Sequence, residues 1–338
     1  MITDKTPVCD IVIRAVLHKQ INAMSATEII PGIYAIKGKF AGEFGYITSY
    51  LVVDGDEALV IDPGTAGDPG NRIEKAIRSL DLKPQSDIVG IVCTHGHPDH
   101  VGGAALLKRG TAAPIMIHSE DADVLANPDT FLTNRVLLDF AGRMSMKLDK
   151  GPLRVNYKGV DPDRTLHDGD TIHAGDIEIK VVQTGGHSAG HCVFLEESRK
   201  VLFTGDEVNN FPNDSRKFYL DLTGSISEKS AALEKLISLK VDYLLPAHDV
   251  PHILGNVNLE LEQVRDGILH FQDTLLHHLR LRSDADIEQL VFDLKAARSV
   301  PIPASYDFLI HTTVQVTLRS FKQAGLVRVD SKGVWSIL

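Results

Sequence analysis

The stretch His95-Gly96-His97-Pro98-Asp99-His100 places three imidazoles and one carboxylate within six residues. It follows an apolar run at 87–94 that is typical of a buried strand, and it precedes residues 101–108, which predict the start of a helix. Imidazole and carboxylate are the side chains that suit zinc and, less selectively, iron. The alternating spacing lets the first two histidines face one ion while the Asp99-His100 pair turns toward a second. The sequence therefore predicts a metal site on this strand-to-helix turn.

Three later loops carry the same kinds of side chain. His187 lies in the run Thr184-Gly185-Gly186-His187-Ser188-Ala189-Gly190-His191, directly after a strand-like segment. Asp206 ends Thr204-Gly205-Asp206, and His248 ends Pro246-Ala247-His248, each again after a strand-like segment. Loops that follow the carboxyl ends of strands in a layered sheet can converge at one edge. We therefore expect these loops and the first turn to build one site.

Together these motifs resemble those of the metallo-β-lactamase-fold hydrolases, and the similarity covers about residues 29–252. The run Val60-Ile61-Asp62-Pro63-Gly64 also matches. The resemblance implies an α/β fold, an αββα sandwich of two sheets between helices. The segments that carry it are 95–100, 186–191, 204–206 and 246–248.

The resemblance also implies a role for each site residue. It implies two Zn²⁺ ions per chain, with iron or manganese as alternative metals. By this resemblance His95, His97 and His187 would bind one ion, and Asp99, His100 and His248 would bind the other. Asp206 would bridge the two ions. Asp62 and Thr94 would support the ligands from behind. His191 either orients a ligand or fills the core, and we favour a supporting role. The residues with expected catalytic roles are Asp99 and Asp206.

A dinuclear site of this kind predicts a hydrolase. Two cations about 3.5–4 Å apart stabilise a bridging hydroxide at neutral pH and polarise an acyl oxygen, so no serine or cysteine nucleophile is needed. Asp99 is one candidate to protonate the leaving group. We expect the substrate to be a small ester, thioester or lactone. The alternatives are a hydrolytic dehalogenase of an activated aryl halide with the same dizinc site, a mononuclear iron persulfide dioxygenase, and a nucleic-acid-binding or nuclease protein.

Two segments are expected to form the wall of the substrate cleft, because each closely follows a sheet element that points toward the site. Pockets for small molecules are mostly apolar with a few polar groups. The dense apolar set at 131–146 supplies Phe131, and the alternative is that this set is an ordinary packed helix. The second segment supplies the predicted substrate-binding residues Asn209, Asn210 and Phe211.

The composition limits the possible partners. The chain has 338 residues, with 35 Lys and Arg against 45 Asp and Glu, a formal charge of −10. This acidic balance disfavours nucleic acid and anionic membrane surfaces as partners. No apolar run approaches the length of a transmembrane helix, and no secretory signal is evident. A cytoplasmic location fits three widely spaced cysteines without a CxxC pair: Cys9, Cys93 and Cys192.

The chain is expected to divide into an N-terminal arm at 1–28, a catalytic domain at 29–254 and a C-terminal domain at 255–338. In the last part, helical patterns at 259–281, 284–297 and 309–325 precede two short strands at 327–329 and 334–337. Helices followed by a hairpin resemble a winged-helix module. The near balance of charge in this part favours support of the cleft or a homodimer contact over DNA binding.

Overall fold

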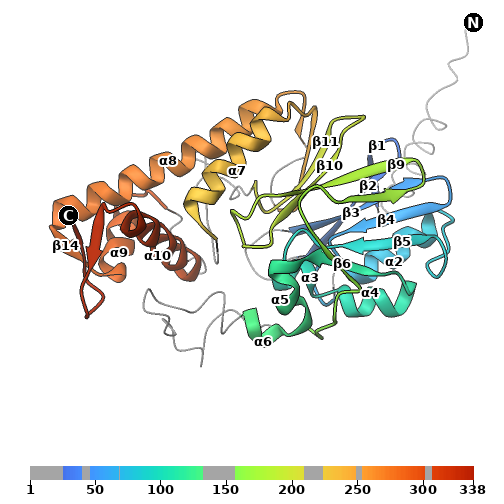
Figure 1. Ribbon diagram of the computed structural model, residues 1–338, viewed down its shortest axis with the longest axis horizontal. Helices are drawn as coiled ribbons and strands as arrows, with labels where there is room; N and C mark the ends of the chain where they lie inside the picture. Colours follow the sequence, from blue (N-terminus) through green and yellow to red (C-terminus); the bar gives the residue numbers. More distant parts are fainter. Residues whose placement is uncertain are drawn as a thin grey trace, which may run out of the picture.

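A computed structural model describes residues 26–39, 46–67, 69–131, 157–208, 224–248, 253–300 and 307–338. Two sheets pack face to face, with helices on the outer face of each (Figure 1). This is the predicted α/β class and αββα arrangement. Most of the predicted arm at 1–28, residues 132–146 and Asn209 to Phe211 lie outside the described residues, and the domain boundaries stay predictions.

Within the described ranges the first sheet has seven strands, and its direction changes in the middle. Strands β1 to β4 are antiparallel, whereas β4 to β7 are parallel. The short turn Gly55-Asp56 joins β3 to β4 as a hairpin. In spatial order the strands are β1 (Thr27–Ile30), β2 (Ile33–Lys39), β3 (Tyr46–Asp54), β4 (Glu57–Ile61), β5 (Ile88–Val92), β6 (Ile115–His118) and β7 (Arg164–Leu166).

The second sheet contains six described strands, in the spatial order β13-β12-β11-β10-β9-β8. Strands β11 and β12 are parallel, and the other neighbouring pairs are antiparallel. The strands are β8 (Thr171–Ala174), β9 (Ile177–Gln183), β10 (Cys192–Glu196), β11 (Val201–Gly205), β12 (Tyr243–Pro246) and β13 (Ile253–Leu254).

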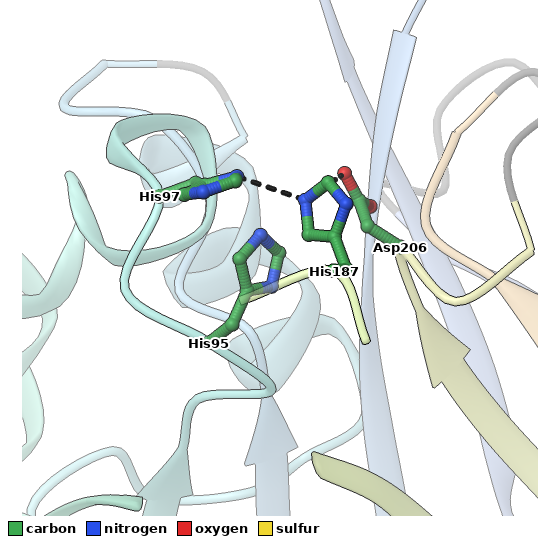
Figure 2. A group of neighbouring side chains, drawn as sticks. All are labelled: His95, His97, His187 and Asp206. Atoms are coloured by element: carbon green, nitrogen blue, oxygen red, sulfur yellow. Dashed lines mark hydrogen bonds and ion pairs between the residues drawn. The ribbon is translucent and has the colours of Figure 1, made fainter. Parts of the chain in front are cut away.

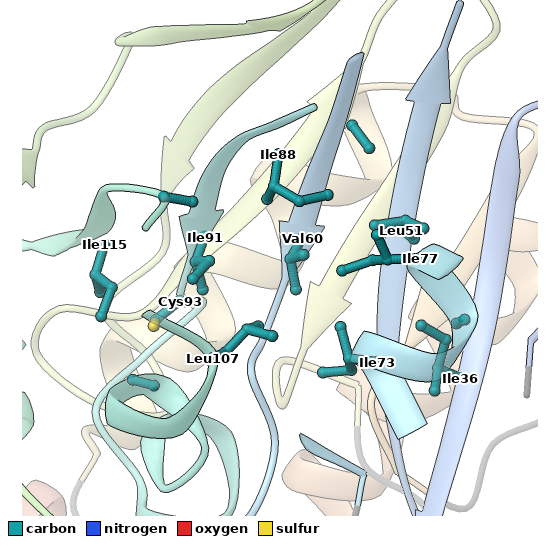
Figure 3. Close-up of a cluster of buried hydrophobic side chains, with 14 of the residues drawn as sticks. Ile36, Leu51, Val60, Ile73, Ile77, Ile88, Ile91, Cys93, Leu107 and Ile115 are labelled. Atoms are coloured by element: carbon teal, nitrogen blue, oxygen red, sulfur yellow. The ribbon is translucent and has the colours of Figure 1, made fainter. Parts of the chain in front are cut away.

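The helices cover the two outer faces. Helices α2 (Gly70–Ser79) and α4 (Ala104–Thr111) pack on the first sheet, and Figure 3 shows Ile73 and Leu107 of these helices against Val60. Helices α7 (Ile226–Ser238) and α8 (Val257–Arg282) pack on the second sheet. The shorter elements are α3 (Pro98–Val101), the 3₁₀ helix η1 (Ser119–Asp121), α5 (Ala122–Ala126) and α6 (Pro128–Thr130).

Strand β4 shows why the layers form. Its side chains alternate between faces, so Ala58 and Val60 pack under the helices while Leu59 and Ile61 pack against the second sheet. All four are buried. Removing a Leu or Ile side chain from water contributes about 1.5–3 kcal/mol, so a strand that is apolar on both faces stabilises the structure only between two layers.

Helix α8 joins the sandwich to a smaller C-terminal unit, formed by its second half, α9 (Ile287–Ala296), α10 (Asp307–Gln323) and strands β14 (Asp284–Ala285), β15 (Val327–Val329) and β16 (Trp335–Ile337) (Figure 1). Leu261 of α8 packs in the core of the sandwich, whereas Leu275 packs with Trp335 in a separate core. The predicted helices and final hairpin are present, which agrees with a helical, winged-helix-like unit.

Two details differ from the predicted elements. Residues 284–285 pair with β16 as a strand instead of starting a helix, because Asp286 forms a capping box with Gln289 and α9 begins only at Ile287. The helix expected at 101–108 is split into α3 and α4 at Gly102-Gly103. A side chain at Gly103 would lie 2.2 Å from the Pro63 carbonyl oxygen. The chain here passes so close to the end of β4 that a larger residue would not fit.

No helix among the described residues is both long and apolar enough to cross a membrane. The two cysteines in the described ranges lie in the core. Cys93 and Cys192 are buried and form no disulfide. Burial raises the pKa of both thiols, so neither is suited to act as a nucleophile.

Candidate metal centre

The site forms where strands of both sheets end at one edge of the sandwich. The turn at 95–100 follows β5, and the loops of His187, Asp206 and His248 follow β9, β11 and β12. Backbone and side-chain hydrogen bonds join the sheets at this edge. Cys192 donates its N–H to the Thr94 carbonyl at 2.8 Å, and the Tyr50 hydroxyl donates to the Pro246 carbonyl at 2.6 Å. The predicted convergence of the four loops is therefore present.

The first group of donors consists of His95, His97, His187 and Asp206, and all four are buried (Figure 2). Each offers one donor atom, and these atoms lie within 4.8 Å of one another. The closest pair is His187 Nε2 and His97 Nδ1, at 2.9 Å. His95 Nε2 is buried and has no hydrogen-bond partner among the described residues. A buried polar atom of this kind needs a partner, and a metal ion fits that need.

The second group consists of Asp99, His100 and His248. His248 Nε2 lies 3.0 Å from Asp99 Oδ2 and 3.2 Å from His100 Nε2. His100 is fully buried, whereas the side chains of Asp99 and His248 are 16% and 12% exposed. This group therefore contains the two most exposed side chains among the donors.

Asp206 lies between the two groups. Its Oδ2 is 3.4 Å from His187 Nε2 in the first group, and its Oδ1 is 3.2 Å from His100 Nε2 in the second. The two oxygens of one carboxylate thus face different donor sets. This geometry matches the bridging position predicted for Asp206.

Burial keeps the histidines of the first group neutral. It lowers the pKa of His95 and of His187 well below the usual value, with nearby histidines acting in the same direction. Burial also lowers the pKa of His97 to about 4, although Asp99 and Asp206 partly oppose it. A neutral imidazole has a free lone pair, and this is the form that binds a metal.

Carboxylates dominate the second group. Burial alone would lower the pKa of His100 and of His248. The nearby carboxylates, Asp206 first among them, have the larger and opposite effect. The pKa of His100 is therefore raised well above its usual value, and that of His248 is raised to about 9. Burial would raise the pKa of Asp99 and of Asp206, but the nearby histidines have the larger effect and lower both pKa values. Without a bound cation the carboxylates therefore favour the protonated forms of His100 and His248, and a metal ion would displace those protons.

Asp62 supports the second group from behind. It accepts hydrogen bonds from the Thr94 N–H at 2.7 Å and from the Thr94 hydroxyl at 2.9 Å, and it contacts His100 Nδ1 at 2.8 Å. A carboxylate on the far nitrogen of a metal-binding histidine fixes the ring's orientation and tautomer. These contacts direct His100 Nε2 into the site.

His191 contacts the backbone of Asp206. Its Nε2 accepts the Asp206 N–H at 3.1 Å, so the ring proton lies on Nδ1, which faces the Thr184 hydroxyl at 2.9 Å. Gly205 makes this approach possible, because a side chain there would lie 2.8 Å from the His191 ring. The ring therefore holds Asp206 from behind, which supports the orienting role favoured for it.

A buried ion pair beneath the first group was missed by the sequence analysis. Lys229 Nζ lies 2.8 Å from Glu207 Oε2, and both side chains are fully buried. Lys229 also donates to the Asp206 carbonyl at 3.0 Å, and Glu207 accepts the His187 N–H at 3.3 Å. The available signal was the position of Lys229 on the apolar stripe of α7, where it lies between Ile226 and Leu233.

Phe131, part of the predicted cleft wall, lies beside the first group. Its ring centre is 5.2 Å from that of His97, and its side chain is buried. The rest of the predicted wall, including Asn209, Asn210 and Phe211, falls outside the described residues, so its contribution stays a prediction.

Comparison with known proteins agrees with this fold and site. The family model of the metallo-beta-lactamase superfamily matches residues 42–248. A metallo-beta-lactamase family protein from Thermus thermophilus superposes with a TM-score of 0.71 at 20% identity, covering 92% of this chain and all of that protein. This structural likeness shows the shared fold alone.

Two relatives have names that state an activity. The human acyl-coenzyme A thioesterase MBLAC2 is 32% identical over 236 residues, covering 64% of this chain and 78% of its own length. The hydroxyacylglutathione hydrolase GloC of Haemophilus influenzae is 30% identical over 154 residues, covering 45% and 62%. An Aquifex aeolicus protein is 36% identical over 156 residues, covering 44% and 59%. The chain thus spans less than two thirds of the length of two of these relatives.

The fold, the clustered His and Asp donors and these relatives define a metal-dependent hydrolase. The chain belongs to the metallo-β-lactamase superfamily.

Proposed function

We propose that this chain is a dinuclear zinc hydrolase that acts on a small ester, thioester or lactone, with thioesters as the best-supported class. The observation that carries the proposal is the position of Asp206, whose two oxygens face the two donor groups at 3.4 and 3.2 Å. A carboxylate in this position can bind two cations at once and offset their mutual repulsion.

The chemistry of the donors supports zinc. Zinc is bound in proteins by imidazole nitrogens and carboxylate oxygens, and catalytic zinc sites leave a coordination position open. When bound, two such ions supply a hydroxide at neutral pH and polarise the carbonyl oxygen of the substrate. His95, His97 and His187 would hold one ion, and Asp99, His100 and His248 the other.

The remaining residues position these ligands and exclude water. Asp62 and His191 fix the His100 ring and the Asp206 backbone. The Phe131 ring covers one side of His97. Asp99 is the ligand with the most exposed side chain in the second group, and its place at the open side supports a role next to the leaving group.

Two considerations favour a thioester. The named relatives are an acyl-coenzyme A thioesterase and a hydroxyacylglutathione hydrolase. A thiol has a pKa of about 8.5, so it leaves as a thiolate without a dedicated proton donor. Such a leaving group suits a site in which Asp99 and Asp206 are both engaged with histidines.

The test is hydrolysis of a substrate panel by protein of known metal content. The panel contains an acyl-coenzyme A, a hydroxyacylglutathione, a lactone and an aryl ester, each assayed with zinc-loaded and metal-free protein. The proposal expects turnover of a thioester by the zinc-loaded form and its loss in the metal-free form. Oxygen uptake on a persulfide by a single-iron form, with no hydrolysis of any ester, would contradict it and favour a dioxygenase.

A further inference from the structure

Asp121 is a buried carboxylate that binds to two separate loops of the metal centre. It lies at the end of η1, directly after β6, and its side chain is 1% exposed. Oδ2 accepts the Gly96 N–H at 2.9 Å and the Ser188 hydroxyl at 2.7 Å. Oδ1 accepts the Gly190 N–H at 3.2 Å.

Two of the three donors lie next to histidines of the first group, and the third, Gly190, lies on the same loop as His187. Gly96 separates His95 from His97, and Ser188 directly follows His187. One carboxylate from β6's end thus joins the turn after β5 in the first sheet to the loop after β9 in the second sheet. Asp121 is not itself in either group of donors, so its effect on a metal would act through these loops.

The packing around Asp121 is too close for larger residues in the loops. A side chain at Gly190 would lie 2.7 Å from Asp121 Cγ, and one at Gly96 would lie 3.2 Å from Asp121 Cβ. The two glycines allow both backbones to reach the carboxylate. Hydrogen bonds to a buried carboxylate are strong, and losing them leaves buried donors unsatisfied.

We propose that Asp121 is a positioning residue that fixes the His95-His97 turn relative to the His187 loop and thereby sets the affinity of the first donor group for its metal. The proposal rests on metal binding as set out under the proposed function. The effect should be largest at the first group, because Asp121 contacts Gly96, which lies between His95 and His97, and Ser188, which directly follows His187.

The test substitutes Asp121→Asn in the full-length chain. Asparagine has the same shape but only one acceptor oxygen, so its NH₂ group must face at least one of the three donors. The matched control is Asp123→Asn, which changes an exposed carboxylate on the adjoining helix α5. Zn²⁺ affinity is measured by competition with a chromophoric chelator. Each variant is also combined with His248→Ala, which removes a ligand of the second group. The zinc affinity of the first group is then measured separately.

Loss of contacts behind metal ligands typically weakens metal binding about 10–100-fold. We expect this loss for Asp121→Asn with and without His248→Ala, and no change for Asp123→Asn. The absorption spectrum of Co²⁺ in the first group should also change. A general structural role would lower the thermal stability of the metal-free protein without changing this spectrum or affinity.

Each other outcome has a definite meaning. If the wild-type chain binds zinc and Asp121→Asn binds it as tightly, the proposal is overturned while the proposed function stands. If the wild-type chain binds no zinc, the proposed function itself fails. If Asp121→Asn does not fold, Ser188→Ala decides: a roughly threefold to tenfold loss of affinity supports the proposal, and an unchanged affinity overturns it.

Discussion

The two donor groups share Asp206 but differ in their surroundings. The first group is buried throughout, and three imidazoles dominate it. The second group contains Asp99 and His248, whose side chains retain 16% and 12% exposure. Phe131 packs beside His97 of the first group, and the second group has the more exposed side chains. We infer that the first group holds its ion firmly, whereas the second exchanges its ion and receives the substrate.

The supports of the two groups also differ, so they can be disturbed separately. Asp121 contacts Gly96 between His95 and His97, and Glu207 contacts the His187 backbone. Contacts from Asp62 reach His100 in the second. Asp206, which is proposed to bridge two ions, is the one ligand whose loss is expected to damage both groups.

The largest effect is therefore expected for Asp206→Ala. Losing the shared carboxylate removes transition-state stabilisation worth several kcal/mol, which lowers kcat/KM by about a thousandfold or more. Metal content should fall below two ions per chain, and the circular dichroism spectrum should stay that of the wild type. Full metal content with near-normal turnover would show that Asp206 does not bridge.

Lys229→Met should have the next largest effect, and it acts on the side of the first group. It leaves Glu207 as a buried charge without its partner, which costs about 3–5 kcal/mol of unfolding free energy, measured by urea denaturation. The double variant Lys229→Met/Glu207→Leu should regain much of this stability, because no lone charge remains buried. If the single and double variants are equally unstable, the ion pair is not the cause.

Asp62→Asn should affect the second group selectively. The backbone at this position has φ +57°, a conformation that asparagine adopts readily, so the change tests the carboxylate alone. The affinity for the second zinc ion should fall about 10–100-fold, while the first ion stays bound in a two-step zinc titration. Equal weakening of both ions would remove the distinction between the groups.

The smallest effect is expected far from the metals, at the ion pair of Arg282 on α8 with Asp293 on α9. The hydrogen bond from Arg282 lowers the pKa of Asp293. The ion pair therefore stabilises the fold fully above the pKa that Asp293 has in the unfolded chain, about 3.9. This stabilisation is lost as the pH falls through the lower pKa that Asp293 has in the folded protein. Arg282→Met should slightly lower the Tm at neutral pH but not below the folded pKa, with both metals retained. A change in metal affinity would link the C-terminal unit to the site.

Sequence patterns were sufficient to predict the layers and the main ligands. The unbroken apolar run at 58–61 in β4 is typical of a strand buried on both faces, and the His and Asp residues follow strand ends where loops converge. Short elements such as β7 and β13 were not predicted, because two or three residues carry no periodic signal. Their pairing depends on neighbouring strands that are distant in sequence.

The supporting residues were predicted less completely than the ligands. Asp62 and His191 came with recognisable motifs, whereas Asp121 and Glu207 look like ordinary acidic residues in the sequence. Their importance depends on burial and on donors up to 69 residues away, as between Asp121 and Gly190. A sequence pattern does not reveal such contacts, because they exist only once both sheets are packed.

The central claim is that one chain binds two metal ions of unequal accessibility. The most direct measurement is elemental analysis of protein reconstituted with zinc, followed over time after a chelator is added. The account predicts two zinc ions per chain, one removed quickly from the open group and one slowly from the buried group. A single ion per chain after reconstitution with zinc, iron or manganese would contradict it.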